Sequence, residues 1–94
     1  MIITHPVPYV QLSASGVIKA GPGYWDGAIV IASAALIFKI FDNPSAASGT
    51  VLYDSSTAVT AGQIITLGGI GIQAKTGLFF SITSGTGTVN VMYI

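Results

Sequence analysis

Short runs of Val, Ile, Tyr and Phe alternate with clusters of Gly, Ser, Thr and Ala along the 94-residue chain. Runs of this kind, bounded by turn-forming residues, are typical of β-strands. No segment combines an apolar stripe at helical spacing with capping residues at its ends, and the scattered Gly residues would weaken a helix. The pattern therefore predicts about eight short strands. They cover residues 9–13, 16–20, 24–32, 36–41, 50–53, 63–67, 78–82 and 88–94, with residues 72–74 as a short continuation of the sixth.

Within the predicted strands, large apolar residues occupy both faces. In the last strand Val89, Val91 and Tyr93 share one face, and Asn90, Met92 and Ile94 share the other. In the strands over 36–41 and 78–82, the first face is predicted to point inward and consists of Leu36, Phe38 and Ile40 and of Leu78, Phe80 and Ile82. Ile37, Phe41 and Phe79 lie on the second, outer face of these strands. A sandwich with water on both outer faces would show a cleaner alternation of apolar and polar residues. The excess of apolar residues on the second face predicts that part of the outer surface is covered in an assembly.

The most apolar stretch, residues 28–41, leaves alternatives open. A membrane-spanning helix needs about 20 apolar residues, and this stretch is shorter, rich in β-branched residues and interrupted by Lys39. We predict strand, either as two strands or as one strand bent around Ser33, Ala34 and Ala35. A membrane-associated helix is the lesser alternative.

These features predict an all-β chain with one domain. Short strands joined by Gly-rich turns favour a single β-sandwich, jelly-roll-like, of about eight short antiparallel strands over residues 9–94. Pro6 and Pro8 keep the start of the chain extended, so residues 1–8 are predicted to form an N-terminal arm. The order of the strands does not follow from the sequence.

The chain has few charged residues, and this makes some classes of binding partner less plausible than others. Charged residues make up 6% of the chain, against about 25% in ordinary soluble domains. The six are Lys19, Lys39, Lys75, Asp26, Asp42 and Asp54. Zero net charge argues against nucleic acid and against an acidic membrane as partners. Because a free monomer needs a charged surface to stay apart from its copies, we predict a homo-oligomer.

The residues able to do chemistry are too few and too scattered for a predicted active site. There is no Cys and no Glu, and His5 alone cannot build a metal site. Asp42 and Asp54 end predicted strands, where Asp commonly accepts hydrogen bonds within turns, and Asp26 before Gly27 is also typical of a turn. We predict a protein that is not an enzyme and has no metal and no cofactor.

Two further patterns receive structural interpretations. Residues 68–71 are rich in Gly, but they lack the spacing of a phosphate-binding loop and the helix that should follow one, so we predict a turn. The aromatic residues Tyr24 and Trp25, with Tyr9, Tyr53 and Tyr93, are predicted in the core or at an interface. A sugar-stacking platform is the alternative, since lectins also use jelly rolls.

Two segments carry a resemblance to a known group of proteins. Residues 41–54 read FDNPSAASGTVLYD, and the chain ends with GLFFSI over residues 77–82 and VNVMY over residues 89–93. Over residues 28–94 this pattern resembles small virion structural proteins of tailed bacteriophages, particularly capsid decoration (cement) proteins. The resemblance implies a β-sandwich, often trimeric, bound to the major capsid protein on the capsid surface of the virion, without catalytic residues. The short arm and the scarcity of charge depart from many such proteins and argue against electrostatic docking.

The resulting functional prediction is a capsid decoration protein that stabilises the phage head shell as a trimer. The predicted contact residues are Ile2, Ile3, Val7, Tyr9 and Trp25. Deletion of residues 1–8 is expected to weaken binding to the shell and to leave the fold intact. The alternative is a tail, fibre or host-attachment module that binds a glycan.

Overall fold

Seven antiparallel strands form the part of the chain that the structure describes. The computed structural model describes residues 8–67 and 71–94, and all regular structure within these two ranges is strand. The strands are β1 (Tyr9–Leu12), β2 (Gly16–Lys19), β3 (Gly23–Asp42), β4 (Thr50–Asp54), β5 (Ile64–Thr66), β6 (Ile72–Ala74) and β7 (Leu78–Tyr93). The predicted all-β, antiparallel, sandwich-like class is confirmed. No helix in these ranges has the length and apolar character needed to cross a membrane, and the stretch 28–41 lies in β3.

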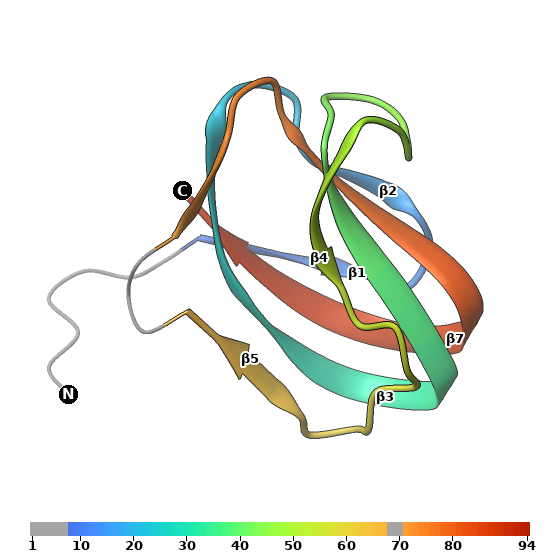
Figure 1. Cartoon of the computed structure of the whole chain (residues 1–94). Coiled ribbons are helices and arrows are strands. Elements are labelled where there is room, and N and C mark those ends of the chain that lie inside the picture. The colour runs from blue at the N-terminus through green and yellow to red at the C-terminus, as the bar shows by residue number, and fades with distance from the viewer. Residues whose placement is uncertain (1–7, 68–70) are drawn as a thin grey trace, which may run out of the picture.

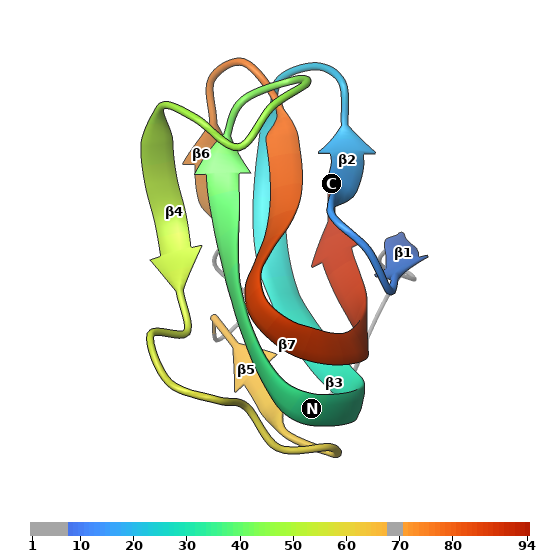
Figure 2. The ribbon, with the colours of Figure 1, turned by 90° about the vertical axis from the view of Figure 1, so that its right-hand side faces the viewer.

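The two long strands β3 and β7 organise the fold, and both are bent at the same place (Figure 2). They pair with each other from Trp25, opposite Tyr93, to Phe41, opposite Phe79. Their register shifts between Ala34 and Ile37, where Ala35 has a φ of 54° and Gly85 a φ of 74°. The predicted strands 24–32 and 36–41 are therefore one bent strand, and so are 78–82 and 88–94.

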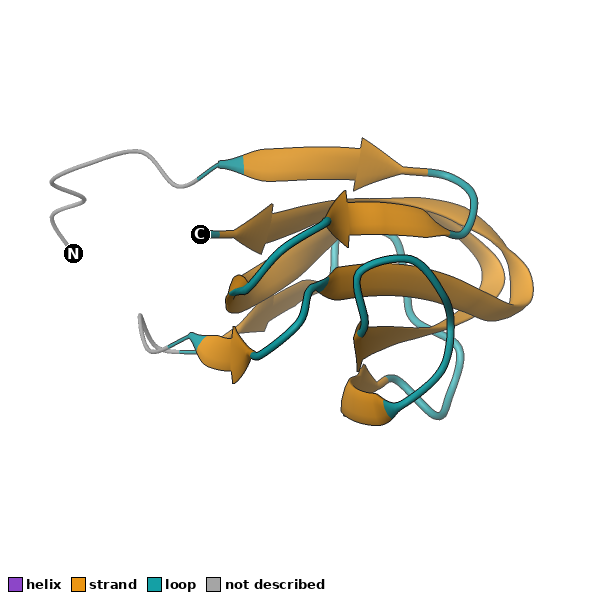
Figure 3. Cartoon of the chain, turned by 90° about the horizontal axis from the view of Figure 1, so that it is seen from above, coloured by secondary structure: helices purple, strands orange, loops and turns teal. Residues whose placement is uncertain are grey.

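The bend folds a single sheet into two layers (Figures 1 and 3). One layer contains β1, the second half of β7, the first half of β3, and then β5 and β6. The other contains β2, the first half of β7, the second half of β3, and β4. Because each long strand belongs to both layers, the chain itself closes the sandwich at the bend.

Alternate side chains of both layers meet in an apolar core. Trp25, Phe38 and Phe80 are its largest fully buried members. The ring centroid of Phe38 lies 5.2 Å from that of Phe80 and 5.6 Å from that of Tyr53. The ring centroids of Tyr53 and Trp25 are 5.1 Å apart. The predicted inward faces are confirmed for the buried residues Leu36, Phe38, Ile40, Leu78, Phe80, Val89 and Val91.

Asp26 and Gly27 lie inside β3 and form a β-bulge, not the turn that the sequence pattern indicated. The register with β7 shifts between Trp25 and Gly27, and Gly27 has a φ of 133°. A Cβ atom at Gly27 would stand 2.5 Å from the carbonyl oxygen of Ile65. The indole Nε1–H of Trp25 donates to the Gly27 carbonyl at 3.0 Å, so the bulge satisfies the one polar group of a buried side chain.

Candidate interaction surfaces

The Asp42 carboxylate is occupied within the chain. It accepts hydrogen bonds from the backbone N–H groups of Lys75 at 3.0 Å, Thr76 at 2.9 Å and Gly77 at 3.4 Å, and from the Thr76 hydroxyl at 2.9 Å. These bonds, led by those from Lys75 and Thr76, lower the pKa of Asp42 from 3.8 to about 2. The carboxylate therefore ties the end of β3 to the loop before β7, and it is not poised for acid–base chemistry.

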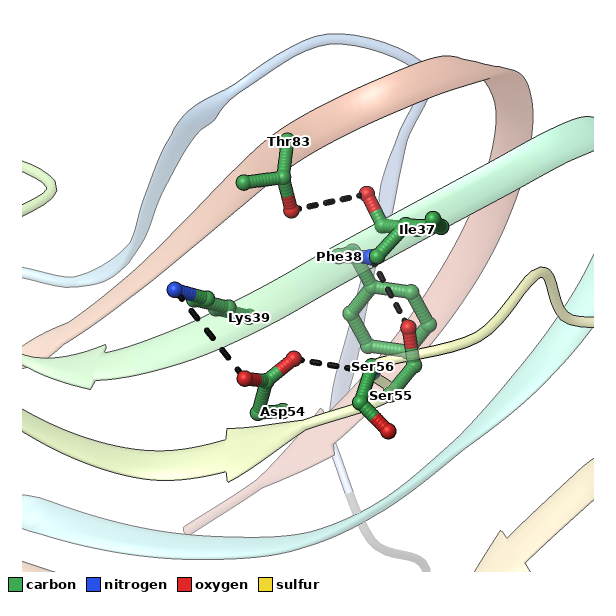
Figure 4. A network of polar contacts seen from close by, with 7 residues as sticks. All are labelled: Ile37, Phe38, Lys39, Asp54, Ser55, Ser56 and Thr83. Carbon is green, nitrogen blue, oxygen red and sulfur yellow. Dashed lines mark hydrogen bonds and ion pairs between the residues drawn. The ribbon is translucent and has the colours of Figure 1, made fainter.

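Asp54 also serves the fold, in the polar network that follows β4 (Figure 4). Its Oδ1 accepts the backbone N–H of Ser56 at 2.8 Å, and its Oδ2 lies 4.0 Å from Lys39 Nζ. Next to it, the Ser55 hydroxyl accepts the backbone N–H of Phe38 at 3.1 Å, and the Ser55 backbone N–H donates to the Phe38 carbonyl at 3.0 Å. The predicted role of Asp54 in a turn is confirmed.

Metal-binding geometry is not found in the part of the chain that the structure describes. Within residues 8–67 and 71–94, no group of three or more His, Asp or Glu side chains could hold an ion. His5 lies outside these residues, as do Gly68, Gly69 and Ile70 of the predicted glycine turn. The features that remain as candidates for function are the outer faces and edges of the two layers.

One outer face carries two rows of side chains that include large exposed apolar residues and no charge. We call it the β1–β5 face and define it by two rows of cross-strand neighbours. The rows are Tyr9–Met92–Gly27–Thr66 and Gln11–Asn90–Ile29–Ile64. Tyr9 is 62% exposed and Ile64 is 61% exposed, and the Gln11 amide donates to Asn90 Oδ1 at 2.9 Å. An uncharged surface with large exposed apolar side chains is suited to burial against a partner.

The opposite outer face, the β2–β4 face, is built differently. Its first row of cross-strand neighbours is Val17–Phe79–Phe41–Val51, and its second is Ser81–Lys39–Asp54. Phe41, in the middle of the first row, is only 9% exposed. The expectation that Phe41 adds to a surface covered in an assembly is therefore wrong, because the monomer already covers this ring. The second row carries the ion pair of Figure 4.

The predicted contact residues meet different outcomes. Ile2, Ile3 and Val7 lie outside the described residues. Tyr9 is exposed on the β1–β5 face, whereas Trp25 has no exposed surface. The prediction that Trp25 contacts a partner is therefore wrong. Trp25 belongs to the core, because its pairing opposite Tyr93 places its side chain in the interior.

The aromatic residues do not assemble into the sugar-stacking platform that was considered. The Trp25 and Tyr53 rings pack against each other in the interior, and burial, followed by the charge of Asp54, raises the pKa of Tyr53. Tyr24 precedes Trp25 in the strand and is 46% exposed, because successive side chains of a strand point to opposite faces. The aromatic cluster belongs mainly to the core.

Ile29 and Ile64 are members of the β1–β5 face that the sequence did not single out. They become neighbours only because β5 pairs with the first half of β3. The pair Ile64–Ile65 was a usable signal, since adjacent strand residues point to opposite faces and one of the two must point outward.

Comparison of the chain with protein-family models, with curated proteins and with solved structures found no match in any of the three. The resemblance to capsid decoration proteins therefore stays a prediction, and the surfaces above are the basis for any functional proposal.

Proposed function

We propose that this chain is a non-enzymatic virion structural protein that decorates and stabilises a phage head shell. The single observation that carries the proposal is the β1–β5 face, with exposed Tyr9 and Ile64 and no charged residue in its two rows. The partner is the major capsid protein on the capsid surface, as the sequence resemblance implies. Many copies bound side by side would add their contributions through multivalency.

The proposed contact rests on area burial. Each Å² of apolar surface removed from water contributes about 25 cal/mol. The two rows of the β1–β5 face contain no charge whose desolvation would oppose this gain, and the partly buried Asp26 lies beside them in β3. The apolar residues Ile2, Ile3 and Val7 precede β1 directly in the chain. An arm at this position would extend the same contact.

The test is co-sedimentation with shells of the phage that encodes this chain, assembled in its absence. Ile64→Lys places a charge within the proposed contact and is expected to weaken binding at least about tenfold, or about 1.4 kcal/mol. Val51→Lys on the β2–β4 face is the matched control, because Val51 is also exposed in a strand, at 42%. Wild-type protein that fails to sediment with the shells would contradict the proposed function.

The arm is tested separately. Pro8 should be kept, because its carbonyl accepts the backbone N–H of Tyr93 at 3.1 Å. Deletion of residues 1–7 is expected to weaken shell binding and to leave the sheet spectrum in circular dichroism unchanged. Binding of the wild type to purified tails or fibres, and not to shells, would favour the alternative of a tail, fibre or host-attachment module.

A further inference from the structure

The edge strands of the two layers differ in how they are protected against pairing with another chain. An open edge presents backbone N–H and C=O groups, and proteins block it with bulges, charges or short strands. β2 is bulged between Val17 and Lys19 and carries the Lys19 charge. β4 is bulged opposite Ile40 and Phe41 and ends at Asp54. β5 and β6 have three residues each.

β1 has neither a bulge nor a charge, and it is one residue longer than β5 and β6. Its four residues pair with β7 in unbroken register, from Tyr9 opposite Met92 to Leu12 opposite Val89. In residues 8–67 and 71–94, β7 is its only partner strand. Figure 3 shows β1 along the outer edge of its layer. β1 is thus the edge best able to accept another strand.

The hydrogen-bond pattern identifies which backbone groups face outward. The Pro8 carbonyl accepts the N–H of Tyr93, so the residue at this position directs its backbone groups toward β7. In an antiparallel pair this direction alternates along the strand. Val10 therefore also faces β7, whereas the N–H and C=O groups of Tyr9 and Gln11 face the open edge. Pro8 has no backbone N–H. An N–H at this position would have faced β7, so the open edge loses no hydrogen-bond donor.

We propose that β1 pairs antiparallel with β1 of a second copy of this chain, around a two-fold axis that passes beside Val10. In this register Tyr9 lies opposite Gln11 of the second copy, and the two Val10 residues lie opposite each other. Each Tyr9–Gln11 pair exchanges both of its backbone hydrogen bonds across the edge. The register also keeps the side chains of each pair on the same face of the extended sheet, as strand pairing requires.

A second copy fits this edge because the edge is complementary to itself. The two residues with outward backbone groups lie one on each side of Val10, so a single two-fold operation joins every donor to an acceptor. Such an interface is closed and stops at two copies. No charge on β1 repels its own copy, and the uncharged rows of the two β1–β5 faces become continuous across the edge. This contact does not depend on the proposed shell binding.

Paired charge variants test the register. Light scattering coupled to size-exclusion chromatography, over a range of protein concentrations, is expected to give twice the chain mass of 9.6 kDa. In Tyr9→Lys/Gln11→Lys, like charges face each other across the edge, and the dissociation constant of the dimer is expected to rise at least about tenfold. In Tyr9→Glu/Gln11→Lys, opposite charges meet and the dimer is expected to return. Ile64→Lys is the matched control, because Ile64 is as exposed as Tyr9 on the same face but lies on the far edge.

Amide hydrogen exchange tests the contact without any substitution. At high concentration the amides of Tyr9 and Gln11 are expected to be protected together with that of Val10. On dilution Tyr9 and Gln11 are expected to exchange at least about tenfold faster, while Val10 keeps its bond to β7. A monomer at all concentrations, a trimer as the resemblance implies, or a dimer that both charge variants leave unchanged would overturn the proposal. Shell binding is measured on Ile64→Lys, so the two proposals can fail independently.

Discussion

The two ends of the sandwich hold the same two layers together by different means. At one end β3 and β7 run through the bend, where Ala35 and Gly85 take positive φ values. At the other end the layers are joined by loops, and the Asp42 carboxylate gathers the backbone N–H groups of Lys75, Thr76 and Gly77. The first end depends on backbone conformation and the second on one ionised group. The two ends should therefore respond differently to substitution and to pH.

The largest effect is expected from Gly85→Ala. An L-residue with positive φ costs about 1–2 kcal/mol, and a Cβ atom here would also collide with the Ala35 carbonyl. We expect the free energy of unfolding to fall by about 3 kcal/mol, measured by urea denaturation.

Two other Gly residues separate the two causes of this loss. Gly62 has a φ of 87° but nothing within 4 Å of an added Cβ, so Gly62→Ala should cost about 1 kcal/mol. Gly21 has open space and no positive φ, so Gly21→Ala should stay within about 0.5 kcal/mol of the wild type. Equal losses in Gly85→Ala and Gly62→Ala would show that the collision at the bend is unimportant.

At the loop end, Asp42→Ala is expected to destabilise the protein more than Asp42→Asn, because Asn keeps an acceptor oxygen. Both should destabilise it less than Gly85→Ala. The amides of Lys75 and Thr76 are expected to exchange at least about tenfold faster in Asp42→Ala. Asp54→Asn is the control, since Asp54 accepts one backbone N–H and forms a longer ion pair at 4.0 Å. Unchanged exchange at Lys75 would contradict the role of Asp42.

The pH dependence distinguishes the two ends most directly. The pKa of Asp42 is lowered to about 2 in the folded protein, from 3.8. A lowered pKa means that the ionised carboxylate stabilises the fold above about pH 4, and that this contribution is lost as pH falls toward about 2. Gly85→Ala should keep this acid-induced loss, whereas Asp42→Asn should lack it. Urea denaturation at a series of pH values measures both, and identical pH profiles would disprove the assignment to Asp42.

The smallest effect is expected from Ala35→Gly. Glycine relieves the cost of a φ of 54° but increases the freedom of the unfolded chain. The balance should stabilise the protein by about 0.5 kcal/mol. Ala34→Gly, at a neighbouring residue without positive φ, should instead destabilise by about 0.5–1 kcal/mol. Changes of the same sign in thermal or urea unfolding would contradict the strained conformation of Ala35.

The sequence predicted those features that depend on local pattern. Alternation identified Leu36, Phe38 and Ile40 as inward residues, and all three are buried. The turn predicted at Asp42 follows β3, and within it Asn43 Oδ1 accepts the N–H groups of Ser45 and Ala46. Side-chain alternation and turn chemistry act over a few residues, so they can be inferred without knowledge of the fold.

Other features could not be predicted because they join distant parts of the chain. The contact of Asp42 with Thr76 spans 34 residues, and local reasoning assigned Asp42 only to its own turn. Trp25 was predicted as a contact residue although pairing with β7 places it in the core. The β1–β5 face exists only because β1, β5 and the halves of β3 and β7 share one layer.

By itself, then, the sequence determined an all-β chain with few charges and no net charge, the alternation of its strands and the turns that follow Asp42 and Asp54. The tertiary structure decided that four predicted strands merge into two bent ones, which apolar residues stay exposed, and which edge remains open. The physical reason is that strand propensity and turn formation are local, whereas strand pairing and burial depend on which distant segments meet.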